Sequence, residues 1–401
     1  MKRKLLPLLI AGLTAASANV ALAGAPTVYG KVNLTLNKYD LEKVNASNNT
    51  VTGAAGSAYT NQDNWKMESN ASRIGVKGDF DISATLKAVY KLEYEVSPSD
   101  DKVGDSGSDF KQRNTYTGLQ SSDWGTVIFG RNDTPIKLIR TEIEAYHDTQ
   151  IGDVNNVLVG ENRLNNILMY TSPTMSGFAL TLAAAPGEYS GKPTTAEPPA
   201  SATEPVKAAY KHTKDDNGLF DAASAAITWT AKNAFVGLAY ENNIANTDTV
   251  ELSGQYTIGP VKLGAVWQKA EENIKGDGIQ SSGLKGDSWS DHLASTANTG
   301  ADRLKEQDGY LVNAQWAVTK EITLKAQYAA SNNTHVVNAT ETELDDTKLK
   351  QIAVGADYKL NDYSKLFAYY AEVKAEGQQV SFANPDDTKD STVAVGYELK
   401  F

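Results

Sequence analysis

Cysteine is absent from the 401 residues, so no disulfide can stabilise the fold. Positive charge is also scarce: 38 Lys and Arg stand against 49 Asp and Glu, a formal net charge of −11. A chain with this acidic balance is a poor candidate for binding nucleic acid. After the first 23 residues there is no run of about 18 apolar residues, which excludes a transmembrane helix but not a membrane β-barrel.

The first residues have the pattern of a secretory signal peptide. Residues 2–4 are basic, a mostly apolar stretch follows, and Ala-Leu-Ala at 21–23 matches the small-x-small cleavage pattern. We therefore expect residues 1–23 to be removed on export and residues 24–401 to form one domain. Cleavage would leave 401 − 23 = 378 residues with 38 − 3 = 35 basic and 49 acidic side chains, a formal charge of −14.

The last ten residues, TVAVGYELKF, alternate between apolar and polar side chains, as in a strand with one apolar face. About sixteen such segments recur along the mature chain, each close to the ~9–11 residues that a tilted strand needs to cross a bilayer. They lie near 27–38, 67–79, 84–96, 110–120, 124–131, 163–172, 177–185, 221–230, 233–242, 248–258, 260–270, 308–318, 321–331, 347–359, 363–374 and 391–401.

The connections between these segments alternate between short and long. Short ones carry turn residues, such as IGP at 258–260 and NDY at 361–363, and long ones include 132–162, 243–247 and 271–307. This sorting is typical of an up-and-down barrel with tight turns at one rim and loops at the other. A soluble sandwich with Greek-key crossovers, the alternative architecture, has no reason to sort its loops in this way. We therefore predict an all-β, transmembrane, 16-stranded antiparallel up-and-down β-barrel.

The same alternation predicts which side chains face lipid. In residues 85–96, TLKAVYKLEYEV, the aliphatic and aromatic side chains fall mostly on one face, opposite Lys87, Lys91, Glu93 and Glu95. A charged side chain turned toward lipid at mid-depth costs about 2–4 kcal/mol. Apolar faces should therefore turn outward to lipid and charged faces inward to a water-filled lumen.

Four segments resemble the Gram-negative general diffusion porins in order and spacing: VYGKVNLTL at 28–36, SRIGVKGDF at 72–80, QRNTYTGLQSSDWGTVIFGRND at 112–133 and VAVGYELKF at 393–401. The resemblance covers nearly the whole mature chain. It implies a homotrimer of outer-membrane barrels in contact with lipid and lipopolysaccharide. It also implies that the barrel-assembly machinery reads the terminal strand as a signal, which assigns that role to Tyr397 and Phe401.

In that family the third outer loop folds inward and narrows the pore. The matching segment is 132–162, and its acidic candidates for the constriction are Glu142, Glu144, Asp148 and Asp153. Glu161 is a further acid in this segment. The Pro-Glu-Phe-Gly-Gly motif of the enteric branch is missing here, so the resemblance does not fix the path of the loop.

The family places basic side chains on the wall that faces this loop, and the matching positions are Lys31, Arg73 and Arg113. Alternation independently turns all three inward. It places Arg113 on the same face as Thr115 and Thr117, opposite Tyr116. Arg131 shares a face with Val127 and Phe129, which indicates a rim residue of undetermined direction.

These features predict a channel for passive diffusion of small hydrophilic solutes and ions, with an acidic loop opposite a basic wall. A substrate-specific porin and a surface adhesin or receptor barrel are the alternatives. The net charge favours cations, whereas wall arginines can favour anions, so the selectivity stays open.

Nothing in the sequence indicates an enzyme. The four histidines, His147, His212, His292 and His335, fall in predicted loops without His-x-x-x-His spacing, and no Gly-x-Ser-x-Gly motif occurs. We expect no catalytic residues, no cofactor and no metal site.

Overall fold

A computed structural model describes residues 25–41, 62–99, 110–186, 218–245, 247–273, 302–337, 342–343, 346–376 and 388–401. The expected signal peptide, residues 1–23, lies outside these described residues. Within the described ranges, no helix has both the length and the apolar character needed to cross a membrane.

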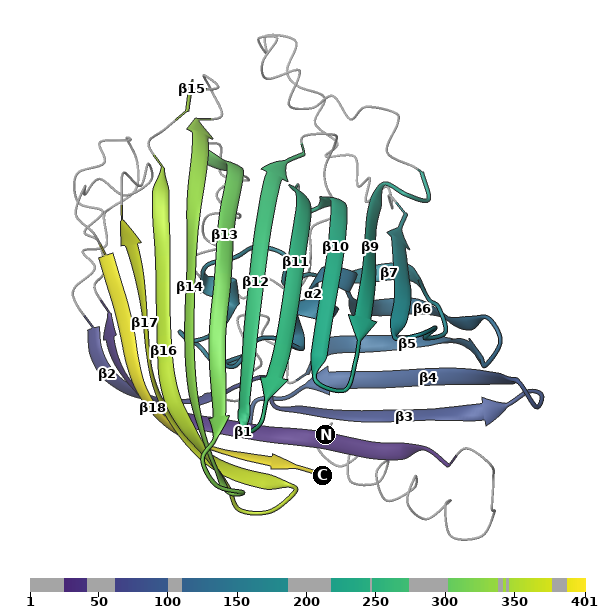
Figure 1. The fold of residues 1–401 in the computed structure, drawn as a ribbon, viewed down its shortest axis with the longest axis horizontal. Helices are drawn as coiled ribbons and strands as arrows, with labels where there is room; N and C mark the ends of the chain where they lie inside the picture. Colours follow the sequence, from purple (N-terminus) through teal and green to yellow (C-terminus); the bar gives the residue numbers. More distant parts are fainter. Residues whose placement is uncertain are drawn as a thin grey trace, which may run out of the picture.

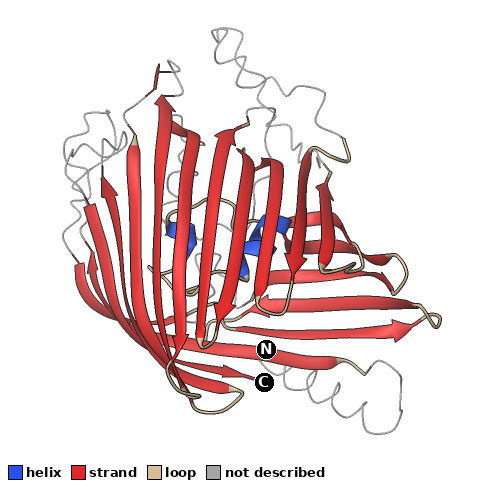
Figure 2. Ribbon diagram, in the orientation of Figure 1, coloured by secondary structure: helices blue, strands red, loops and turns tan. Residues whose placement is uncertain are grey.

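The described chain forms one antiparallel sheet that closes on itself (Figures 1 and 2). Its strands are β1 (Thr27–Leu41), β2 (Gln62–Ser69), β3 (Arg73–Asp81), β4 (Leu86–Glu95), β5 (Lys111–Ser121), β6 (Gly125–Asp133), β7 (Arg163–Thr171), β8 (Phe178–Ala185), β9 (Ala222–Thr230), β10 (Ala234–Ile244), β11 (Thr247–Ile258), β12 (Val261–Glu272), β13 (Asp302–Ala317), β14 (Ile322–Val337), β15 (Thr342–Glu343), β16 (Thr347–Lys359), β17 (Ser364–Glu376) and β18 (Thr388–Lys400). Closure comes from β1, which pairs with β18 on one side and with β2 and β3 on the other.

The prediction of a 16-stranded barrel is confirmed. The 18 labelled strands reduce to sixteen wall strands because β2 and β3 follow one another along β1 and because β15 is a two-residue extension beside the end of β14. The predicted continuous strand at 67–79 is interrupted at residues 70–72, where Ala71 has a φ of 48°. Asn33 holds both sides of this break: its carbonyl accepts from the Asn70 amide at 2.8 Å, and its amide donates to Ser72 Oγ at 2.9 Å.

Two loop predictions are wrong. The connection near 243–247, expected to be long, is a tight turn between Ile244 and Thr247, because Asp248 Oδ1 accepts from the Asn243 amide at 2.8 Å and holds the chain there. His335, expected in a loop, belongs to β14, which continues to Val337 through its pairing with β13.

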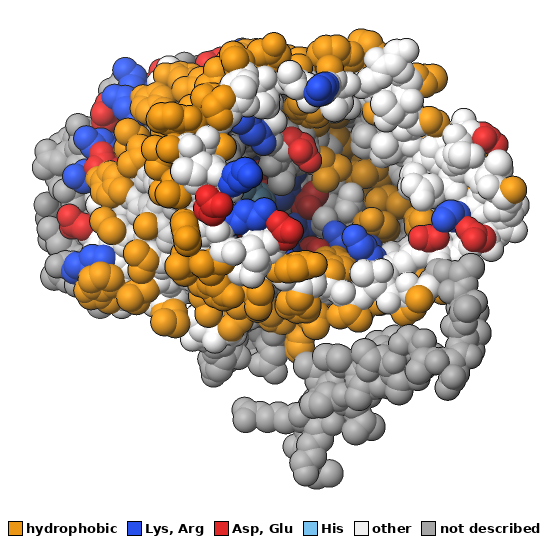
Figure 3. Space-filling model, turned by 60° about the horizontal axis from the view of Figure 1, so that its bottom comes forward, with side chains coloured by type: hydrophobic (Ala, Val, Ile, Leu, Met, Phe, Trp, Pro, Cys, Tyr) orange, Lys and Arg blue, Asp and Glu red, His pale blue; other side chains and the backbone are white. Residues whose placement is uncertain are grey.

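The exposed apolar side chains of the strands face outward, and most of the polar ones face inward. Leu252 is 48% exposed between the fully buried Glu251 and Ser253, and Ile352 is 43% exposed between Gln351 and Ala353. Figure 3 shows hydrophobic side chains over the outer surface and charged ones around a hollow in the middle. This distribution is the reverse of a soluble sandwich and is the one that a barrel wall exposed to lipid requires.

The chain's last residue closes the barrel. Gly30 and Phe401 exchange two backbone hydrogen bonds, with N to O distances of 2.9 and 3.1 Å. The Phe401 ring packs on Gly30, where an added Cβ would overlap the ring and lie 2.8 Å from the carbonyl oxygen of Arg73. A side chain at position 30 would therefore obstruct the β1–β18 junction.

We predict that Gly30→Ala destabilises the barrel by about 1–3 kcal/mol, the usual cost of forcing extra volume into a packed site. The matched control is Gly254→Ala on β11, where the nearest described atom to the new Cβ is 3.9 Å away. Urea unfolding in lipid vesicles, followed by tryptophan fluorescence, measures both variants. Equal stability of the two would contradict this account of closure.

Candidate functional site

The segment 134–162, between β6 and β7, contacts buried side chains of the wall strands β9 to β17. It begins with helix α2 (Pro135–Thr141), whose first residue is a proline, favourable at that position because the first helical N–H needs no partner. A short 3₁₀ helix, η3 (Val154–Asn156), follows. Ile136 and Ile139 of α2 are buried against Ala226 of β9 and Ala239 of β10, so small wall residues leave room for the helix.

Three wall glutamines hold the backbone of this segment. Gln307 accepts from the Val159 amide at 2.9 Å, and Gln327 accepts from the Ala145 amide at 3.0 Å. Gln351 donates to two segment carbonyls at 2.6 and 2.7 Å. All three glutamines are buried, and each carboxamide both donates and accepts, so they replace the water that the segment's backbone would otherwise need.

A buried ion pair anchors the helix. Arg140 and Glu251 are both fully buried, and Arg140 Nε donates to Glu251 Oε2 at 2.8 Å. Arg140 also donates to the Val159 carbonyl at 2.8 Å and to the side chain of Gln268. The guanidinium thereby joins the two ends of the segment to β11 and β12.

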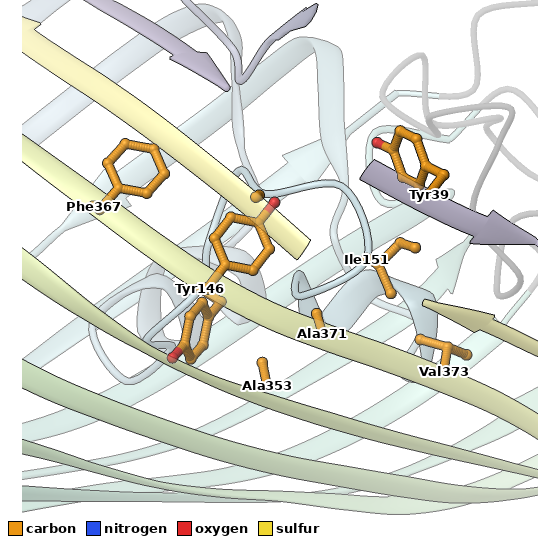
Figure 4. Packing of buried hydrophobic residues seen from close by; sticks show 9 residues of the cluster. Tyr39, Tyr146, Ile151, Ala353, Phe367, Ala371 and Val373 are labelled. Atoms are coloured by element: carbon orange, nitrogen blue, oxygen red, sulfur yellow. The ribbon is translucent and has the colours of Figure 1, made fainter. Parts of the chain in front are cut away.

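Apolar contacts complete the attachment. Tyr146 and Ile151 pack with Ala353 and Ala371 of the wall (Figure 4). Further along, the side chain of Leu158 and its neighbours Val154 and Val157 are buried in a second cluster with residues of β12, β13, β14 and β16. The segment therefore packs tightly against the wall formed by β9 to β17.

An open cavity of about 480 Å³ lies on the other side of the segment, against β1, β3, β4 and β5. Charged side chains dominate its lining. The basic ones are Lys31, Arg73, Lys91, Arg113, Lys137, Arg163 and Lys400, and the acidic ones are Glu93, Asp133 and Glu142.

The structure brings the three predicted wall cations together at this cavity. Lys31 Nζ lies 2.8 Å from Asp148 Oδ2, and Arg73 Nη1 lies 3.4 Å from the same atom. Arg113 pairs instead with two glutamates of the neighbouring strand β4, at 3.1 Å from Glu93 and 2.8 Å from Glu95. Lys31 and Arg73 thus pair with the segment, whereas Arg113 pairs with β4 of the barrel wall.

One direction prediction, made for Tyr116 opposite Arg113, needs revision, and the direction of Arg131 was left undetermined. The β4–β5 register shifts between Leu92 and Tyr94. Tyr116 therefore packs against the buried cluster that includes Ile128 and Ile167, and it does not oppose Arg113 as predicted. A second register shift follows Gly130, whose φ is 138°. There Arg131 bonds to the Gln112 carbonyl at 3.2 Å and to Asn165 Oδ1 at 2.7 Å, between β5 and β7.

The four predicted acids separate into two groups. Glu142 is exposed and lines the cavity, and Asp148 meets the basic wall. Glu144 accepts from the Val154 amide, and Asp153 accepts from the amides of Asp148 and Asn155, so these two carboxylates hold the segment's own fold.

Buried charges in the segment shift one another's protonation. Burial raises the pKa of Glu144 to about 7, reinforced by Asp153 nearby. Burial alone would lower the pKa of His147, but Asp148 and Glu144 outweigh it and raise that pKa to about 9. Burial likewise acts against the charged form of Asp148, yet His147, Lys31 and Arg73 hold its pKa well below the usual range.

Other lining residues were not predicted as site residues. The sequence did indicate Lys91 and Glu93, because alternation in residues 85–96 turned both side chains inward. No sequence pattern indicated Lys137, Arg163 or Asp133. Their positions depend on ion pairs across the fold, such as the pair of Arg163 Nη2 with Asp133 Oδ1 at 2.8 Å.

A family model for Gram-negative porins matches residues 9–378. The chain belongs to the Gram-negative porin family. Among curated relatives, an outer membrane porin protein of Bordetella pertussis is 25% identical over 347 residues, 83% of each chain. Outer membrane porin protein 32 of Delftia acidovorans is 28% identical over 219 residues, 52% of this chain and 57% of its own.

Solved structures show the same fold. The anion-selective porin from Comamonas acidovorans superposes with a TM-score of 0.59 at 18% identity, covering 94% of this chain and 100% of its own. The outer membrane channel DcaP of Acinetobacter baumannii gives 0.59 at 15% identity, with 94% and 98% coverage. This porin is therefore a β-barrel channel protein of the Gram-negative outer membrane.

Loss of the buried pair should release the segment. Arg140→Met leaves Glu251 buried without its partner, and such a loss costs about 3–5 kcal/mol. The double variant Arg140→Met with Glu251→Leu removes both charges and should recover most of that free energy. Urea unfolding gives the free energies, and limited proteolysis within 134–162 reports the release. Wild-type stability of Arg140→Met would show that the pair does not anchor the helix.

Proposed function

We propose that this porin is a water-filled channel for passive diffusion of small hydrophilic solutes and ions, narrowed by a charged constriction. The observation that supports it most directly is the 480 Å³ cavity lined by charged side chains between segment 134–162 and the wall at Lys31, Arg73 and Arg113. In this proposal the segment is the third outer loop, folded inward. Because glutamines and the Arg140–Glu251 pair fix it, the loop sets a constant pore width.

We further propose that the constriction favours anions. The cavity lining holds seven Lys and Arg side chains against three acids, although the mature chain as a whole is acidic. A permeating ion comes closest to the side chains that line the cavity, whereas charges in distant loops are screened beyond a Debye length, about 10 Å at 0.1 M salt. The name of the Comamonas porin, anion-selective, is consistent with this proposal.

Export and assembly of the protein involve the first residues and the terminal strand. We propose that residues 1–23 are a cleaved signal peptide, that the mature chain forms a homotrimer, and that the barrel-assembly machinery reads the terminal strand through Tyr397 and Phe401. Outer-membrane lipid and lipopolysaccharide are then its surroundings. The solved trimer form of a Vibrio cholerae outer membrane protein, with a TM-score of 0.56 at 14% identity, shares the fold.

Selectivity tests the constriction. An ion about 4 Å from a unit charge gains about 1 kcal/mol in water, so loss of Arg73 should reduce the anion-to-cation permeability ratio about two- to fivefold. We predict this for Arg73→Gln from the reversal potential across a planar bilayer in asymmetric salt. Lys359→Gln is the control, because Lys359 pairs with Asp362 beside a turn and does not line the cavity.

An unchanged reversal potential in Arg73→Gln would reject Arg73 as part of the constriction. Wild-type protein that inserts but gives no open conductance steps would reject the channel itself. Specific saturable block by one sugar or amino acid would favour the substrate-specific alternative over general diffusion.

A further inference from the structure

Three side chains of segment 134–162 converge in a way that the proposed channel does not explain. Each of Glu144, His147 and Glu161 offers one ligand atom, and these atoms all lie within 4.8 Å of one another. Glu144 and Glu161 are buried, and His147 is partly exposed and lines the open cavity. The convergence is three-dimensional, since Glu161 comes fourteen positions after His147 in the chain.

Glu161 lacks a partner for one of its oxygens. Its Oε2 pairs with Lys137 Nζ at 2.8 Å, but the buried Oε1 has no hydrogen-bond partner among the described residues. Leaving a buried carboxylate oxygen unpaired is energetically unfavourable. In native proteins such a group usually indicates a water, an ion or a functional role.

The surroundings of His147 also suit a metal ligand. Its Nδ1 is 3.2 Å from Glu144 Oε2, while its Nε2 is 3.5 Å from Asp148 Oδ1. A carboxylate beside the second ring nitrogen is the usual arrangement for a metal-bound histidine, because it fixes the tautomer and the ring orientation. Asp148 is itself fixed by Lys31 and Arg73.

We propose that Glu144, His147 and Glu161 bind one divalent transition-metal ion, of the class represented by Zn²⁺. One imidazole nitrogen with two carboxylates suits zinc and disfavours Ca²⁺ and Mg²⁺, which prefer oxygen ligands alone. Three protein ligands leave a coordination position for water, and His147 at the cavity provides the entry route.

Bound zinc would act on conduction as well as on the segment. It would link residues 144–147 to residue 161, the two arms of the loop. It would also add positive charge beside the basic cavity, which increases the preference for anions. This second consequence depends on the proposed channel function, whereas the binding itself does not.

Calorimetry with ZnCl₂ on untagged, EDTA-treated protein in detergent tests the binding. We expect one zinc per chain in wild type, and at least tenfold weaker binding in both His147→Ala and Glu161→Gln. The control is Glu142→Gln, which removes an exposed neighbouring acid outside the ligand set and should bind as wild type does. The other three histidines are present in every variant and give a common background.

Heat-dependent gel mobility establishes that each variant is folded before titration. Equal zinc affinity in all four proteins, or no stoichiometric binding in folded wild type, would overturn the site. In planar bilayers, saturating zinc should move the reversal potential further toward anions in wild type and in Glu142→Gln but not in His147→Ala. A reversal potential that zinc does not change in wild type would overturn the link to conduction, and absence of channels would count against the channel function alone.

Discussion

The architecture depends on one constraint: in hydrocarbon, every backbone N–H and C=O must be paired within the protein. An unpaired group there costs several kcal/mol, so a sheet can cross a membrane only when it closes on itself. Here β1 completes the ring by pairing with β18, with the final Phe401 on Gly30. The outward apolar and inward polar faces follow, because closure separates a lipid side from a water side.

Closure in turn separates the lipid-facing side chains from those that bind segment 134–162. Many inward-facing wall residues are polar, and several of them bind this segment in place of water. The buried glutamines satisfy its backbone, the Arg140–Glu251 pair fixes its helix, and Tyr146 and Leu158 seal it against the wall. Because one side is packed, the open cavity lies on the opposite side, where Lys31 and Arg73 meet Asp148.

Sequence alternation was sufficient for the fold and for most of the wall. It predicted sixteen strands, their approximate bounds and the lipid-facing side, because each is a local property of the chain. It failed at irregular positions. After a strand break, as at Ala71, or a register shift, as near Arg113, the side chains that would have faced inward face outward and the reverse. No simple sequence pattern marks such positions.

The interior of the site was less predictable for a different reason. Whether a carboxylate such as Glu144 or Asp148 faces the cavity or the segment's own backbone depends on contacts with distant strands. The missing family motif in this loop removed the only local guide to its path. The convergence of Glu161 with His147 likewise comes from the loop's fold, so spacing along the sequence gave no indication of it.

The central claim is that apolar side chains face lipid while segment 134–162 borders a water-filled passage. The chain has no cysteine, so single cysteines introduced as Leu252→Cys and Glu142→Cys can each carry one spin label. Accessibility measured in lipid vesicles should show the label at 252 reached by oxygen dissolved in lipid, and the label at 142 reached by a water-soluble nickel chelate. The reverse pattern, or aqueous access at both positions, would contradict the account.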